Sequence, residues 1–131
     1  MDPRPWARRT VGGDVSAVLK ACDIGVLSSA SEGMPLALLE YGMNGLAAVA
    51  TQVGQCAEVL DHGRAGLVVP PGSSSALAEA IISLLNSPER RAGLGERLRQ
   101  RTAQAYSADA CVNQICGVYD RVLRDRSPEA I

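Results

Sequence analysis

This 131-residue sequence has little excess charge of one sign, little histidine and no long apolar run. Its 13 Lys and Arg against 14 Asp and Glu leave a formal charge of −1, which gives no electrostatic reason to expect nucleic acid as a partner. With one His and no Cys-x-x-Cys pair, the chain lacks the ligand spacing of a zinc site, and we predict no metal. No apolar run approaches the roughly 20 residues that cross a bilayer, so we predict no transmembrane segment.

The start of the chain, Met1–Trp6, lacks the apolar core of a secretory signal, and we therefore expect a cytoplasmic protein. Residues 1–13 are rich in Pro and Arg, and we predict that this segment is disordered. The thiols of all four cysteines are expected to be free and buried, where they behave as small hydrophobic side chains.

What is present is the composition of a folded protein. With 47% hydrophobic and 21% charged residues, the chain has too much apolar content and too little net charge for disorder as its main state. Its length fits one domain, which we place at residues 14–126.

Short apolar runs alternate with helical patterns along this domain, which predicts an α/β fold with a parallel sheet. The helix after the first strand is expected to have Pro35 as its first residue and to stop at Asn44-Gly45. We expect about three parallel strands flanked by helices, a partial Rossmann-like sheet, and then C-terminal helices. The expected strands are 23–28, 47–51 and 66–70, and the other expected helices are 15–22, 57–60, 73–85, 89–105 and a last one from 108.

The C-terminal helical region, residues 89–126, carries eight Arg against five acids, which we interpret as a solvated helix face. Its last helix has a stripe of apolar residues that needs cover from the open side of the sheet or from another chain, namely Val112, Ile115, Tyr119, Val122 and Leu123. The apolar edge of the first strand would also recruit other chains, so we expect self-association.

In a parallel sheet of this kind, ligands bind beyond the carboxyl ends of the strands, where the loop Ser28–Met34 is expected. This loop of small residues leads into the helix that Pro35 begins. Free N–H groups at such a helix start, together with the helix dipole, favour an anion such as a phosphate. Gly33 would let the backbone come close to that ligand.

Glu32 and Glu40 lie eight positions apart around this helix start. The helix rises about 7.5 Å between Pro35 and Glu40. Two carboxylates cannot grip a phosphate, because like charges repel, but they can accept hydrogen bonds from hydroxyl groups on either side of it, as a sugar and a ribose offer. The spacing alone leaves a second interpretation open, in which both are ordinary solvated residues at a helix start.

The stretch Ser29–Glu40 resembles the glutamate–seven residues–glutamate signature of retaining, nucleotide-sugar-dependent glycosyltransferases with the GT-B fold, of the group 1 or family 4 type. Further matches follow in the order and spacing of that family: Asn44-Gly45, Val49–Thr51, Gly54 with Glu58, Gly63–Gly72, Ala76–Ile81, Tyr106-Ser107 and Val118-Tyr119. The resemblance covers roughly residues 14–123 and implies a partial GT-B C-terminal domain, which binds the sugar donor.

The resemblance also implies roles for residues. Glu32 would hold hydroxyls of the donor sugar and is the candidate catalytic residue, while Glu40 would bind the ribose of the nucleotide. The backbone that would meet the diphosphate and sugar belongs to Gly33, Met34, Pro35 and Leu36, with no amide from the proline. The expected donor is a UDP- or GDP-sugar whose hexose is transferred with retention, and no metal or other cofactor is needed.

The chain departs from the family pattern at three places. Ala47 stands where the family usually has proline, Tyr41 where it has alanine, and Gly54-Gln55 where it has a glycine pair. Ala47 would relax the loop entering the second strand, and Tyr41 is expected to alter packing. Gln55 would narrow a loop near the donor and change sugar preference or weaken binding.

The resemblance extends only to the later part of a donor domain, so the expected partners are a nucleotide-sugar and either an N-terminal acceptor domain or a second copy. We expect the full enzyme to be cytoplasmic, peripheral to the inner membrane, and the isolated chain to be inactive. An alternative is a non-catalytic fragment, or a partner-binding α/β module without nucleotide. A third is another phosphate-ligand protein of the α/β class.

Overall fold

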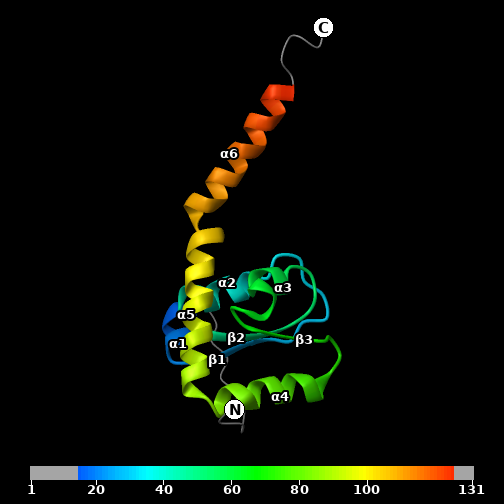
Figure 1. Ribbon diagram of the computed structural model, residues 1–131, viewed down its shortest axis with the longest axis vertical. Coiled ribbons are helices and arrows are strands. Elements are labelled where there is room, and N and C mark those ends of the chain that lie inside the picture. Colours follow the sequence, from blue (N-terminus) through cyan, green and yellow to red (C-terminus); the bar gives the residue numbers. More distant parts are fainter. Residues whose placement is uncertain (1–14, 126–131) are drawn as a thin grey trace, which may run out of the picture.

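The computed structural model describes residues 15–125, so the expected disordered segment 1–13 lies outside the described residues (Figure 1). The elements follow in the order α1 (Val15–Lys20), β1 (Ile24–Leu27), α2 (Leu36–Met43), β2 (Ala47–Thr51), α3 (Cys56–Val59), the short 3₁₀ turn η1 (Asp61–Gly63), β3 (Leu67–Val69), α4 (Ser74–Leu85), α5 (Pro88–Ala105) and α6 (Ala108–Asp125). The alternation of strands and helices confirms the predicted α/β class.

The three strands form one parallel sheet in the order β1-β2-β3. Ile24 of β1 pairs with Ala47 of β2, and Val49 of β2 pairs with Leu67 of β3. Because the strands are parallel, the loops that follow β1, β2 and β3 all emerge at the same edge of the sheet.

Helices cover both faces of this sheet, with α2 and α3 on one side and α4 on the other (Figure 1). Every residue of β2 is buried, so β2 is the centre of the core. Its side chains alternate between the two faces, as the two-residue period of a strand requires. One cluster contains Leu38, Ala48, Ala50, Cys56, Val59, Leu60, Ala65 and Leu98. The other contains Ala47, Val49, Val69, Leu84 and Leu94.

The long helix α5 connects the layers, because it contacts α2, β2 and α4. Two glycines allow it to come this close. A Cβ on Gly95 would lie only 2.1 Å from the carbonyl oxygen of Gly45, and a Cβ on Gly42 only 2.4 Å from Cγ2 of Thr102. Any side chain at either glycine would push α5 away from the loop and helix that it covers.

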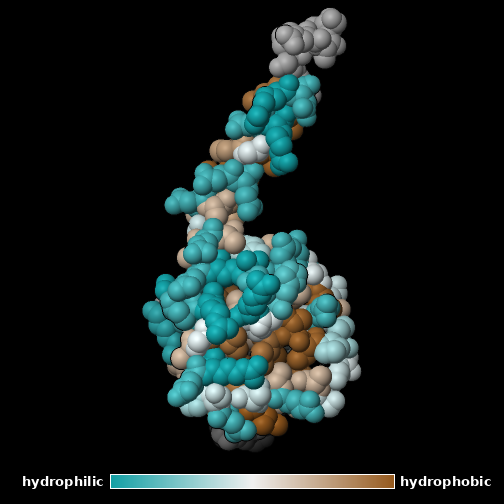
Figure 2. All heavy atoms as spheres, viewed as in Figure 1, coloured by the Kyte–Doolittle hydropathy of each residue, from teal (hydrophilic) through white to brown (hydrophobic). Residues whose placement is uncertain are grey.

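The last helix, α6, runs away from the rest of the fold (Figure 1). Its predicted apolar stripe is exposed, with Ile115 at 55% and Tyr119 at 66% of their accessible surface, and therefore receives no cover from the sheet. Apolar surface is visible along this helix among hydrophilic residues (Figure 2). Within residues 15–125, no helix is both long enough and apolar enough to span a membrane.

The predictions for Pro35 and for the cysteines were wrong in detail. Pro35 is the residue before helix α2 and not its first residue, because its ψ of 86° lies outside the helical range. Of the four free cysteines only Cys56 is buried, whereas Cys22, Cys111 and Cys116 are exposed. The thiols of α6 are exposed because nothing in the described part of the chain covers that helix.

The side chain of Tyr41 lies over β1. Its ring occupies the space that a Cβ on Gly25 would need, at 2.5 Å from such an atom, and its hydroxyl donates to the carbonyl of Val26 over 3.3 Å. The carbonyl oxygen of Leu27 faces β2, where it lies 3.5 Å from the Thr51 hydroxyl oxygen. Because carbonyls alternate along a strand, that of Val26 faces the other edge of β1. The predicted packing role of Tyr41 thus includes a hydrogen bond at this edge.

Candidate functional site

The loop that carries Glu32 emerges at the carboxyl edge of the sheet, between β1 and α2. Beside it lies a hollow of about 270 Å³ that is rich in small and hydroxyl-bearing residues, lined by Ser28, Thr51, Gly72, Ser73, Ser74 and Leu77. These residues come from the ends of β1, β2 and β3 or the segments that follow them. The site therefore occupies the edge at which ligands bind in open parallel sheets.

The carboxylate of Glu32, a half-buried residue, is held by a neighbouring serine. The hydroxyl of Ser29 donates to Oε1 of Glu32 over 2.7 Å. The carbonyl of Ser29 in turn accepts from the hydroxyl of Thr51, at the end of β2, over 2.6 Å. Sequence reasoning missed this role of Ser29 and Thr51, since the spacing of residues 22 positions apart carries no signal of their contact.

The main chain around Glu32 is held by the loop that follows β2. The backbone N–H of Gln55 donates to the carbonyl of Gly33 over 3.1 Å. Gly54 has φ of +50°, and a Cβ there would lie 1.9 Å from the carbonyl oxygen of Glu32. Only glycine can stand at this position, because any side chain would clash with the loop that carries Glu32. Gly54, which the resemblance also singled out, thus allows the loop after β2 to lie directly against that loop. Gln55 and Gly33 are both exposed.

The start of α2 is the next part of the site. Met34 and Leu36 are exposed, at 40% and 65%, whereas Pro35 is buried. No side chain caps this helix start, although Ser73 accepts from the N–H of the third residue of α4 and Ser87 from that of the third residue of α5. The first N–H groups of a helix have no partner inside the helix. In α2 the third of them, on Leu38, donates to the Pro35 carbonyl over 3.0 Å, which leaves the first two for a ligand.

Glu40 lies one helical turn after Leu36 and shares an exposed face of α2 with it. The two glutamates are thus on separate elements. Glu32 is hydrogen-bonded back to Ser29 in the loop, and Glu40 stands on the helix that follows.

Within residues 15–125, no group of three or more His, Cys, Asp or Glu could hold a metal ion. The pKa of neighbouring Tyr41 is raised, mainly by burial and then by the charge of Glu40.

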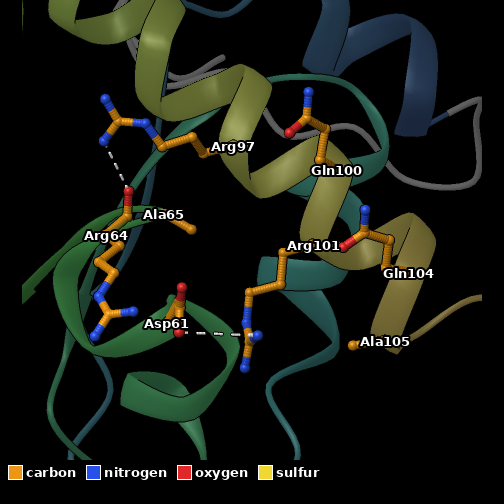
Figure 3. A pocket seen from close by; sticks show the side chains of 8 residues that line it. All are labelled: Asp61, Arg64, Ala65, Arg97, Gln100, Arg101, Gln104 and Ala105. Atoms are coloured by element: carbon orange, nitrogen blue, oxygen red, sulfur yellow. Dashed lines mark hydrogen bonds and ion pairs between the residues drawn. The ribbon is translucent and has the colours of Figure 1, made fainter.

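A second hollow, of about 300 Å³, lies between α5 and η1 and is rich in arginine (Figure 3). Its arginines do not converge on a common point. Arg101 donates to the carbonyls of Glu58 and Val59 at the end of α3, and Arg97 donates to the carbonyl of Arg64 over 3.0 Å. The predicted solvated face thus holds for Arg97, which is exposed, and is wrong for Arg101, which is half-buried. Both side chains attach α5 to the segment around η1. His62 is exposed in η1.

Residues 8–101 match the model of a protein family described as Glycosyl transferases group 1. The chain belongs to this family. It is 32% identical over 112 residues to the N-acetyl-alpha-D-glucosaminyl L-malate synthase of Bacillus anthracis. That alignment covers 86% of the chain but 29% of the relative, so the chain spans less than a third of that enzyme.

Solved structures confirm the fold. The sucrose-phosphate synthase of Thermosynechococcus elongatus superposes with a TM-score of 0.75 and 27% identity, over 82% of this chain and 27% of that one. HepE of Anabaena, solved in complex with UDP, gives a TM-score of 0.74 at 24% identity, over 79% of this chain and 29% of HepE. The three parallel strands with their flanking and C-terminal helices are thus part of a GT-B C-terminal domain.

Proposed function

We propose that this chain is the donor-binding part of a retaining glycosyltransferase that uses a UDP- or GDP-hexose and no metal ion. The observation that carries the proposal is the uncapped start of α2, which follows a loop with one fixed glutamate and leads to a second glutamate on its exposed face. Phosphates bind well at such helix starts, because free N–H groups and the helix dipole both favour negative charge.

In this proposal the diphosphate of the donor meets the N–H groups of Gly33, Met34 and Leu36. These groups stabilise the negative charge that grows on the leaving diphosphate as the bond to the sugar breaks. Glu32 accepts hydrogen bonds from hydroxyls of the donor sugar, and Glu40 accepts them from the ribose. The carboxylates then lie on either side of the phosphates, which avoids direct repulsion.

The relatives support a nucleotide-sugar donor. The Bacillus anthracis protein is named an N-acetyl-alpha-D-glucosaminyl L-malate synthase, and HepE, part of which superposes on this chain, has been solved in complex with UDP. Because the chain spans 29% of the Bacillus relative, we propose that the acceptor is held by a further domain. A cytoplasmic location, peripheral to the inner membrane, belongs to the same proposal.

Titration of the chain with UDP, GDP and UDP-glucose, followed by nuclear magnetic resonance, tests the site. We expect binding no tighter than about millimolar, equivalent to about −4 kcal/mol, since one domain contributes only part of the donor contacts. Glu40→Ala should abolish it, whereas Glu79→Ala, on the exposed side of α4, should not. Micromolar binding that survives Glu40→Ala would place the nucleotide elsewhere.

Transfer of sugar by the isolated chain should not exceed that of a Glu32→Ala variant, because catalysis needs both reactants in one closed cleft. The alternative, a partner-binding module without nucleotide, predicts no resonance shifts at residues 32–40 with any of the three ligands. Shifts confined to that segment would exclude it.

A further inference from the structure

We propose that Ser29 is a positioning residue for Glu32 and that Thr51 keeps Ser29 in place. What Glu32 binds rests on the function proposed above. The arrangement of the three residues stands on contacts within the chain.

The contacts form a path from the sheet to the carboxylate. Thr51 ends β2 and is only 5% exposed, so the sheet fixes the position of its hydroxyl. That hydroxyl donates to the Ser29 carbonyl over 2.6 Å, and the Ser29 hydroxyl donates to Oε1 of Glu32 over 2.7 Å. Hydrogen bonds to an ionised acceptor are short and stronger than those between neutral groups. Two bonds therefore connect the buried strand to the side chain that would meet the sugar.

This path acts on the side chain of Glu32 and not on its main chain. The main chain is held separately, by Gly54 against the Glu32 carbonyl and by the Gln55 N–H on the Gly33 carbonyl. Loss of the Ser29 hydroxyl should thus leave the loop in place and free only the carboxylate. A glutamate side chain that must be ordered on binding lowers affinity, because its rotational freedom is lost at that moment.

Ser29 occupies one acceptor position of Oε1, so Oε2 is the oxygen of Glu32 that is wholly free to accept from a sugar hydroxyl. Ser29 should accordingly influence recognition of the sugar and leave recognition of the nucleotide unchanged. This selectivity separates a positioning role from a general role in loop stability.

The binding test compares Ser29→Ala with Ser31→Ala, an exposed serine of the same loop, using UDP-glucose and UDP as probes. Ser29→Ala should weaken UDP-glucose binding by about fivefold, the effect of one net hydrogen bond, and leave UDP binding unchanged. Ser29→Thr, which keeps the hydroxyl, should restore UDP-glucose binding. Equal weakening for both probes, or an equal effect of Ser31→Ala, overturns the proposal.

A second measurement needs no ligand. Side-chain coupling constants of Glu32 should report one rotamer in the wild type and averaged rotamers in Ser29→Ala and Thr51→Val, with no change in Ser31→Ala. Unchanged couplings in Ser29→Ala overturn the positioning role. If the wild type binds neither probe, the proposed function fails by itself, and the couplings still decide the role of Ser29.

Discussion

Substitution of Gly54 by alanine tests how tightly the two loops of the site are pressed together. At φ of +50° an alanine is strained, which costs about 1–2 kcal/mol. Its Cβ would also lie 1.9 Å from the Glu32 carbonyl oxygen, far inside van der Waals contact, so one loop must move. Overpacking of this kind costs about 1–3 kcal/mol more. We therefore expect Gly54→Ala to lower the free energy of unfolding by about 2–5 kcal/mol.

Gly45→Ala is the matched control. Gly45 also has positive φ, +66°, but a Cβ there has nothing within 4 Å, so this variant loses only about 1–2 kcal/mol from backbone strain. Urea unfolding followed by circular dichroism measures both losses. If Gly54→Ala and Gly45→Ala are destabilised equally, the loops are not in the close contact described, and the argument for a fixed Glu32 main chain fails with it.

Three further outcomes are expected. Arg101→Ala should lower the free energy of unfolding by about 1–2 kcal/mol, because it removes charge-assisted bonds to carbonyls at the end of α3. Arg99→Ala is the control, since the ion pair of Arg99 is exposed, and its free energy of unfolding in a urea titration should be unchanged. A thiol reagent should modify three cysteines quickly and Cys56 only after unfolding, since Cys56 is buried and its pKa is raised by that burial. Equally fast modification of all four thiols would contradict the buried position of Cys56. Because the Tyr41 pKa is raised in the fold, the tyrosine loses its proton at lower pH in the unfolded chain than in the folded one. The free energy of unfolding should therefore fall as the pH rises above about 10, the usual pKa of tyrosine. Tyr41→Phe should remove that part of the fall in a pH series of unfolding curves.

Elements of this fold could be predicted where local chemistry decides them. Asn44-Gly45 ends α2, with Gly45 at positive φ, and Ser73 begins α4 by accepting from the backbone N–H of Ala76. These signals act over a few residues, and so the sequence shows them directly. The position of Glu32 after β1 followed from the same local reasoning.

Contacts between distant segments could not be predicted in this way. The bond from Thr51 to Ser29 exists because β1 pairs with β2 in one particular register. The bond from Arg101 to Val59 exists because α5 brings that arginine to the end of α3. Exposure of the α6 thiols was missed for a related reason. An apolar stripe shows which face of a helix needs cover, and it does not show what supplies that cover.

The hydroxyl of Tyr41 has a consequence for β-augmentation at the outer edge of the sheet. A strand that adds to β1 must donate hydrogen bonds to those carbonyls of β1 that face away from β2. Strand β1 has only four residues, and the Val26 carbonyl already accepts from the Tyr41 hydroxyl. An incoming backbone N–H must share this carbonyl or displace the tyrosine, whose ring is seated on Gly25. An extended segment that docks at this edge must therefore compete with the Tyr41 hydroxyl for one of the few acceptors that β1 offers.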